Sequence, residues 1–174
     1  MKKFIALFAL MVITLASYAQ VYKMYNTRNY HNQLRLNTMT GEVQQIQDDG
    51  QSWIVCSARE ISGDKESRFR LYETQNMWTF ILLDSYNGRL WQVQYSAQDL
   101  DNLFCIPINK YELVSDNENC IFSIQPLTSM YQYYLINDRT GDMWKFQWST
   151  KGDDYRWIEN LNSYHPLICS WFYL

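Results

Sequence analysis

The stretch FILLDSYNGRLWQVQ, residues 80–94, decides the fold class. It opens with an apolar run, passes through Asp84–Gly88 and returns with Trp91 and Val93 two positions apart. The turn begins with Asp, which can bond its own backbone, and ends with Gly, which tolerates positive φ. On the returning segment, Trp91, Val93 and Tyr95 share one face of a strand. The stretch therefore predicts a β-hairpin whose Trp91 packs in the core.

The same unit occurs three times in the chain. Residues 68–94 align without a gap with 21–47 and with 121–147, at offsets of 47 (68 − 21) and 53 (121 − 68). Each copy carries apolar side chains at alternate positions of two segments, which predicts strands with one buried face. The equivalent turns all begin with Asn or Asp and end with Gly: Asn37–Gly41, Asp84–Gly88 and Asn137–Gly141. Three hairpins of one design are expected.

A further strand is expected after each copy. The segments are SWIVCS (52–57), NLFCIPI (102–108) and YRWIEN (155–160), and the apolar segment PLICSWFYL (166–174) is a thirteenth candidate. Four short strands per unit and almost no helical periodicity predict one all-β domain over residues 20–174, with units that start near 21, 68 and 121. The thirteenth strand would close or cover an exposed sheet edge.

Copy one departs from the other two at aromatic positions. It has Gln44 where they have Trp91 and Trp144, and His31 where they have Trp78 and Tyr131. Aromatic side chains that could form a binding surface are therefore concentrated in copies two and three.

The returning strands have an aromatic face and a polar face. Trp144 shares a face with Phe146 and Trp148, so we predict that it is buried, like Trp91. For the polar face we expect cross-strand hydrogen bonds on a solvated sheet surface, with a shared recognition function as the alternative. The glutamines that recur on this face are Gln47, Gln94 and Gln147.

Two architectures fit three units of this kind. The order of a strand, a hairpin and a further strand resembles a β-trefoil, the fold of fibroblast growth factors and many lectin domains, and this is the expected fold. The segments LLDSYNGRLW (82–91) and LINDRTGDMW (135–144) resemble the strand-turn-strand portion of quinoprotein-type β-propeller blades, so a small propeller is the alternative. Propellers have about 4–8 blades, so three units would need a second copy to complete the ring.

The segments TQNMWTFILLD (74–84) and GRLWQVQ (88–94) also resemble a repeat of uncharacterised exported bacterial proteins. The resemblance covers residues 21–147 and implies an exported repeat protein, with no particular activity. Ricin-type lectins carry a Gln-x-Trp signature, whereas this chain has the reversed arrangement Trp91-x-x-Gln94. Sugar binding by analogy with those lectins is thereby weakened.

Residues 1–19 have the pattern of a secretory signal peptide. Two lysines precede an apolar run over residues 4–16, and small residues follow before Gln20. The run is shorter than the ~20 residues of a membrane span, so we expect cleavage, export to the periplasm or beyond, and no membrane span afterwards. Cleavage leaves 15 − 2 basic side chains against 18 acidic ones, so the net charge moves from −3 to −5. A nucleic-acid partner is not expected, because no basic cluster is visible.

Four cysteines would meet an oxidising compartment after export. We expect one or two disulfides, with all three pairings open and with buried free thiols as the alternative. No Cys-x-x-Cys spacing occurs, so a zinc site or a thioredoxin-like centre is not expected. The cysteines are Cys56, Cys105, Cys120 and Cys169.

The sequence offers little to catalysis. Its two histidines, His31 and His165, lie in no context that suggests a nucleophile beside a base. The acidic pairs lack the spacing of an EF-hand calcium loop, and no glycine-rich phosphate loop is present. We therefore predict a protein that is not an enzyme, with no catalytic residue, no metal and no cofactor.

Aromatic content points instead to recognition. Aromatic residues make up 17% of the chain, including 14 Tyr and 7 Trp, more than one domain can bury completely. Exposed Tyr and Trp favour binding of sugars, peptides or protein surfaces. We predict a non-enzymatic binding module for glycans or envelope proteins, with a self-assembling envelope protein or an exported hydrolase as alternatives. The candidate ligand-binding residues are Trp53, Trp148, Trp157, Gln94 and Gln147.

Overall fold

The computed structural model describes residues 20–115 and 121–162. Within these residues, strands β1 to β12 form three antiparallel sheets of four strands each. The all-β prediction with three units is therefore confirmed. Several sequence predictions lie outside the described residues: the signal peptide (1–19), Cys120, His165, Cys169 and the strand at 166–174.

Each sheet consists of one copy of the repeat and the strand that follows it, in chain order. Sheet A holds β1 (Tyr22–Asn26), β2 (Asn32–Asn37), β3 (Val43–Gln47) and β4 (Ser52–Cys56). Sheet B holds β5 (Phe69–Glu73), β6 (Thr79–Asp84), β7 (Leu90–Gln94) and β8 (Phe104–Pro107). Sheet C holds β9 (Phe122–Pro126), β10 (Gln132–Asn137), β11 (Met143–Gln147) and β12 (Trp157–Asn160). The strands expected after each copy are confirmed, and no sheet closes on itself within the described residues.

The hairpin turns form as the sequence predicts. In sheet B, Gly88 N donates to Asp84 O at 3.0 Å, and Asp84 Oδ1 accepts from Tyr86 N at 3.1 Å. Gly88 has φ +77°, a conformation that strains side chains with a Cβ. Gly41 and Gly141 repeat this geometry, each with φ +78°.

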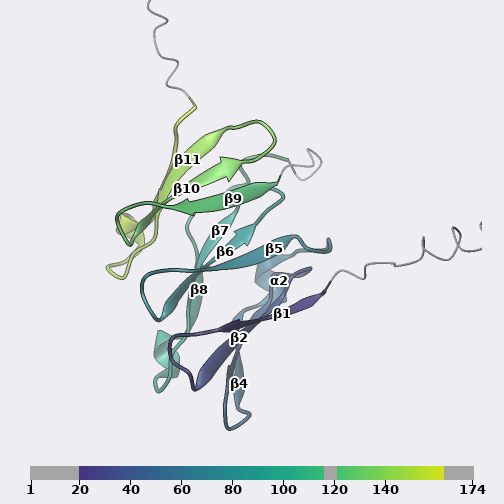
Figure 1. The fold of residues 1–174 in the computed structure, drawn as a ribbon, viewed down its shortest axis with the longest axis vertical. Coiled ribbons are helices and arrows are strands. Elements are labelled where there is room, and N and C mark those ends of the chain that lie inside the picture. The colour runs from purple at the N-terminus through teal and green to yellow at the C-terminus, as the bar shows by residue number, and fades with distance from the viewer. Residues whose placement is uncertain (1–19, 116–120, 163–174) are drawn as a thin grey trace, which may run out of the picture.

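The three sheets lie face to face in chain order, with sheet B in the middle (Figure 1). All six residues of β6 are buried, because alternate side chains point into the A–B core and into the B–C core. The prediction of strands with one buried face is therefore wrong for sheet B. Its second face meets sheet C instead of water.

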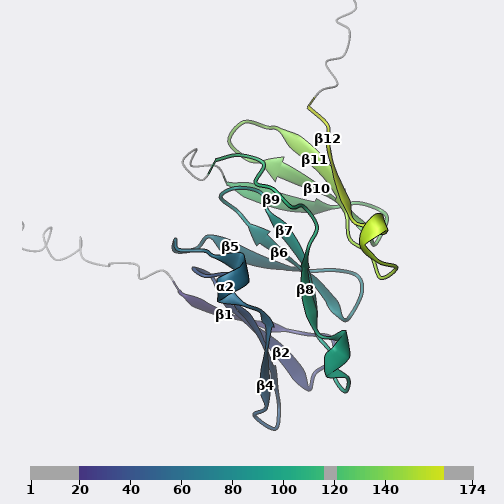
Figure 2. The same cartoon turned by 180° about the vertical axis from the view of Figure 1, so that it is seen from behind.

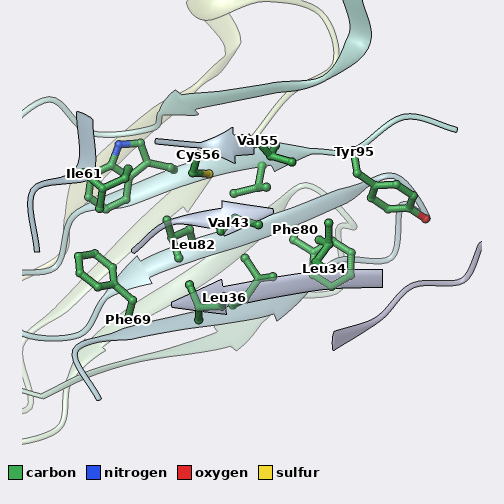
Figure 3. Packing of buried hydrophobic residues seen from close by; sticks show 13 residues of the cluster. Leu34, Leu36, Val43, Val55, Cys56, Ile61, Phe69, Phe80, Leu82 and Tyr95 are labelled. Carbon is green, nitrogen blue, oxygen red and sulfur yellow. The ribbon is translucent and has the colours of Figure 1, made fainter. Parts of the chain in front are cut away.

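The A–B core is built from aliphatic and aromatic side chains of both sheets (Figure 3). Leu34 and Leu36 of β2 and Leu82 of β6 are completely buried, each stabilising the fold by about 1.5–3 kcal/mol. Trp91 is 4% exposed in this core, and Trp144 is 6% exposed in the B–C core. The prediction that both tryptophans are core residues is confirmed.

A buried glutamine joins each sheet to the next. The Gln45 side chain is 0% exposed; its Nε2 donates to Ser96 O at 2.6 Å and its Oε1 accepts from Ser96 N at 3.2 Å. Gln92, the equivalent residue of sheet B, is also buried and accepts from Ser149 N at 3.2 Å. The polar face expected to be solvated is therefore buried at these positions, where each amide oxygen accepts a backbone N–H of the next sheet. Gln45 Nε2 also bonds the next sheet, whereas Gln92 Nε2 is buried without a hydrogen-bond partner among the described residues.

A backbone hydrogen bond recurs at the same boundaries. Phe69 N of β5 donates to Thr38 O at 2.9 Å, and Phe122 N of β9 donates to Ser85 O at 2.8 Å. Thr38 and Ser85 are equivalent residues, each directly after the second strand of its sheet. The two sheet boundaries thus use the same contacts in the same order.

A disulfide reinforces the first boundary. Cys56 in β4 and Cys105 in β8 are bonded, with their Cα atoms 5.2 Å apart. The prediction of at least one disulfide is confirmed, and the structure supplies the pairing that the sequence left open.

Helical structure in the described residues is limited to short segments between strands (Figure 2). These segments are the helix α2 (Ala58–Ile61) and the 3-10 turns η1 (Leu100–Asn102) and η3 (Asp153–Tyr155). No helix of the described part of the chain has the length and apolar character that crossing a membrane requires.

Candidate functional site: a groove beside Trp78

Trp78 stands at the end of sheet B, paired with Tyr95. The two ring centroids are 5.3 Å apart, and Tyr95 N donates to Trp78 O at 3.1 Å. Tyr95 is buried and donates its hydroxyl to Met77 O at 2.7 Å, whereas Trp78 is half-buried. Tyr95 thus anchors the pair while one part of the Trp78 ring stays accessible.

Sheet C repeats this aromatic pair with Tyr131 and Trp148. Their centroids are 4.9 Å apart, and Trp148 Nε1 donates to Met130 O at 3.0 Å, as the Tyr95 hydroxyl does to Met77. Trp148 is 0% exposed in the B–C core. The expectation of an exposed Trp148 that contacts a ligand is therefore wrong, because its ring packs between sheets and its only polar atom is already bonded.

Sheet A has a polar pair at the same place. His31 Nδ1 lies 2.9 Å from Asp48 Oδ2, and the side chains are 61% and 62% exposed. This side of sheet A has no sheet packed against it among the described residues, so an aromatic pair would face water. The Tyr30 ring packs against His31, with their centroids 4.0 Å apart, and the described residues that line the adjoining hollow include no Ser, Thr, Cys, Lys or Tyr.

Two open hollows lie on either side of Trp78 and share Trp78, Gln94 and Asn102. The first has a volume of about 460 Å³ and extends along residues 95–99 toward Asn29. The second has a volume of about 430 Å³ and extends toward sheet C, where Arg156 and the segment after β11 line it. We call the combined feature the Trp78 groove.

Short-range hydrogen bonds hold the Trp78 loop in place. Asn76 Oδ1 accepts from Trp78 N at 2.8 Å, which fixes the backbone that carries the ring. Thr74 Oγ1 accepts from Asn76 N at 3.1 Å and donates to Thr79 O at 2.7 Å. Such Asx-type and Thr-type turns satisfy the loop backbone locally, so the ring is positioned before any ligand arrives.

The opposite wall of the groove is built around η1. Asp99 Oδ1 accepts from Asp101 N at 3.0 Å, and Asp99 Oδ2 accepts from Asn102 Nδ2 at 2.7 Å. Gln94 Nε2 donates to Asn102 O at 3.2 Å. The Gln94 side chain lines both hollows, so its amide is available to a ligand in either of them.

Charge is sparse in the Trp78 groove. Asp99 lies at one end, and Arg156, which pairs with Asp153, lies at the other. Burial lowers the pKa of Arg156, and burial raises the pKa of Tyr95, so the phenol stays a neutral hydrogen-bond donor. Between the two ends the lining consists of amides, backbone groups, the rings of Trp78 and Tyr95 and the apolar side chains of Phe104 and Ile106, which suits a neutral ligand better than an ion.

The structure brings one predicted ligand-binding residue, Gln94, into the Trp78 groove. Gln147 accepts from Gln132 Nε2 at 2.9 Å and donates to Tyr155 O at 3.0 Å, so it supports a cross-strand contact and the η3 turn. Trp53 and Trp157 are half-buried and line neither hollow of the groove. A role for them in binding stays a prediction.

Sequence reasoning missed Trp78 and Asn102 as candidate site residues. Trp78 aligns with Tyr131 and His31 at an aromatic repeat position, which was the available signal. What the sequence could not supply was the hollow on each side of the ring, since this depends on how loops of three sheets meet.

Among the described residues, no group of three or more His, Cys, Asp or Glu side chains is placed to hold a metal ion. Comparisons with protein-family models, curated proteins and solved structures find no match to the chain.

Proposed function

We propose that this protein is an exported, non-enzymatic binding protein that holds a neutral carbohydrate in the Trp78 groove. The observation that carries the proposal is the half-buried Trp78 ring between two open hollows that also share the amides of Gln94 and Asn102. An indole face packs against the C–H face of a sugar ring, and amides bond its hydroxyl groups.

The shape of the groove supports a chain-like ligand. The two hollows meet at Trp78, so a ligand that stacks on the ring can extend to both sides, toward Asn29 and toward Arg156. Each hollow has the volume of a small-molecule site, within about 300–1,000 Å³. An oligosaccharide of a few sugar units fits this description better than a single sugar.

The arrangement of the sheets supports the propeller-like alternative over the trefoil. Each unit pairs its four strands with one another in a meander, as a propeller blade does, and successive units stack face to face. We therefore describe the sheets as three consecutive blade-like units. Loops at the edge of such a stack, where the Trp78 groove lies, commonly carry the function of the fold.

The test is a glycan array followed by calorimetry on the chain from residue 20 onward, the form that signal cleavage would leave. Trp78→Ala is compared with Tyr131→Ala, a matched control that removes the equivalent ring from sheet C, outside both hollows. We expect Trp78→Ala to weaken binding at least about tenfold and Tyr131→Ala to leave it unchanged. An absence of glycan binding, or equal binding by both variants, would overturn the proposal.

Envelope-protein binding is the second outcome that the experiment can reveal. If the array is silent and affinity capture from envelope extracts recovers one protein that Trp78→Ala no longer retains, the groove recognises a peptide instead of a glycan. The exposed aromatic side chains outside the groove, such as Tyr30 at 80%, would then be tested as further contacts.

A further inference from the structure

The two ends of the sheet stack carry opposite halves of one interface. The A–B and B–C boundaries both place the second and third strands of one sheet against the first three strands of the next, and β4 adds Val55 and Cys56 at the A–B boundary. Within the described residues, the face of sheet C that would pack on a following sheet is uncovered. The face of sheet A that would receive a preceding sheet is also uncovered there. We call them the C-end face and the A-end face.

The C-end face retains apolar character without a sheet on it. Tyr134, Ile136 and Met143 are half-buried there, at positions equivalent to the fully buried Ile81, Leu83 and Leu90 of sheet B. Trp157 lies on the same face, with Lys145 Nζ 5.8 Å from its ring centroid. The face is therefore a mixed surface of large apolar side chains with Lys145 and, directly opposite it on β12, Glu159.

The A-end face is also mixed. Tyr22 is 51% exposed, and its equivalents in sheets B and C are Phe69 and Phe122. Met24 is 46% exposed, and its equivalents are Leu71 and Ile124. These four equivalents belong to the two cores or pack against them. Ile54, 55% exposed, lies on this face opposite Gln44. Three large apolar side chains thus face water on one sheet.

One pair of positions on the two end faces is complementary in charge, while Arg35 on the A-end face and Glu159 on the C-end face are further charged side chains. Lys145 replaces the interface glutamines Gln45 and Gln92, which contact the backbone of Ser96 and Ser149. On sheet A the residue equivalent to those serines is Asp49, next to Asp48. If the C-end face packed on an A-end face in the geometry of the internal boundaries, Lys145 would meet Asp49.

The recurring backbone bond is also open at both ends. Phe69 N bonds Thr38 O and Phe122 N bonds Ser85 O, and the equivalent atoms at the ends are Tyr22 N and Asp138 O. Neither makes a bond of this kind to another sheet within the residues the structure covers. A second copy could therefore supply the missing donor and acceptor.

We propose that two copies of this chain pack head to tail through these faces, each C-end face on the A-end face of the other, to close a ring of six blade-like sheets. One copy provides three sheets, below the range of about 4–8 blades in propellers, whereas two copies provide six and three copies would exceed that range. Ring closure by two copies also gives twofold symmetry and leaves no open end for fibre growth.

The proposal is tested by the mass of the chain from residue 20 onward, measured by light scattering and sedimentation over a range of concentrations. We expect a dimer that dissociates on dilution. Lys145→Asp and Asp49→Lys should each weaken the dimer about tenfold or more, because each places like charges together. The double variant should restore it, since the pair is then reversed.

Lys110→Asp is the matched control, because it makes the same charge change on the exposed loop after β8 and should leave the dimer intact. A monomer at every concentration, a trimer or open polymer, or a dimer unaffected by both single charge changes would overturn the proposal. Loss of the dimer on deletion of 167–174 would also overturn it, because the contact would then involve that segment. None of these outcomes bears on glycan binding at Trp78, which is measured separately.

Discussion

Arg68 and Asp84 form an ion pair inside the protein: Arg68 Nη2 donates to Asp84 Oδ2 at 2.7 Å, and Arg68 Nε lies 2.9 Å from both carboxylate oxygens. The side chains are 5% and 2% exposed. Asp84 begins the hairpin turn of sheet B, where sheets A and C have a neutral Asn. The position of Arg68 is occupied in those copies by Val21 and Ile121, so charge appears at both positions or at neither.

This pairing predicts a rescue. Arg68→Val alone should lower the free energy of unfolding by about 3–5 kcal/mol, because it leaves the Asp84 carboxylate buried without its cation. The double variant Arg68→Val/Asp84→Asn, which copies the combination in sheet A, should recover most of that loss. Urea unfolding of the three proteins measures the difference. A double variant no more stable than Arg68→Val would contradict this account.

The disulfide predicts a large effect on stability. Cys56→Ala/Cys105→Ala opens a link between residues 49 apart and should lower the free energy of unfolding by on the order of 4 kcal/mol, through greater freedom of the unfolded chain. Thermal unfolding with and without reductant checks this. Reductant should destabilise the unmodified chain strongly and the double variant much less; an equal response would mean that other cysteines dominate.

The interface glutamines predict a contrast between two residues in one strand. Gln45→Leu should cost about 2–3 kcal/mol, because Ser96 N and O and Asn32 Oδ1 would remain buried without this partner. Gln47→Leu should cost about 1 kcal/mol or less, since Gln47 is half-buried and donates one bond, to Ala97 O at 3.2 Å. Equal losses in chemical denaturation would contradict the role of Gln45 as an interface contact.

Tyr95 predicts a loss of stability in alkaline solution. Burial raises its pKa above the ordinary value of 10.0, so the folded state resists ionisation while the unfolded state loses a proton. The stability contributed by the neutral phenol is present below the unfolded pKa and falls as pH rises toward the folded pKa. Tyr95→Phe should flatten the melting temperature against pH above about pH 10. Burial also raises the pKa of Tyr133, so the Tyr95→Phe variant should keep part of the alkaline slope. A slope equal to that of the unmodified chain would contradict the role of Tyr95.

The hairpins could be predicted from sequence because their signals are local. Asn37, Asp84 and Asn137 bond their own turn backbones, and the glycines four residues later adopt positive φ. Alternation of side chains then fixed which residues share a face. Trp91 and Trp144 were placed correctly for this reason.

The stacking of the sheets could not be predicted in the same way. Gln92 is a polar residue on a strand, and polar residues usually mark a solvated face. Its burial depends on Ser149 N, 57 residues away, which no local pattern contains. The same limit applies to the candidate site: Trp148 and Trp78 both occur in aromatic pairs, yet only the neighbouring sheets and loops make one of them a core residue and the other a groove wall.

The construction of each sheet from one continuous stretch of chain has a consequence for how the protein folds. Strand pairs join residues close in sequence, so the contact order of each sheet is low and its loops close at small entropic cost. A chain that emerges N-terminus first can pair β1 to β4 before the rest is present. Its apolar inner face then stays exposed until sheet B arrives, which makes the interval between these two events the period in which the nascent protein is most vulnerable to aggregation.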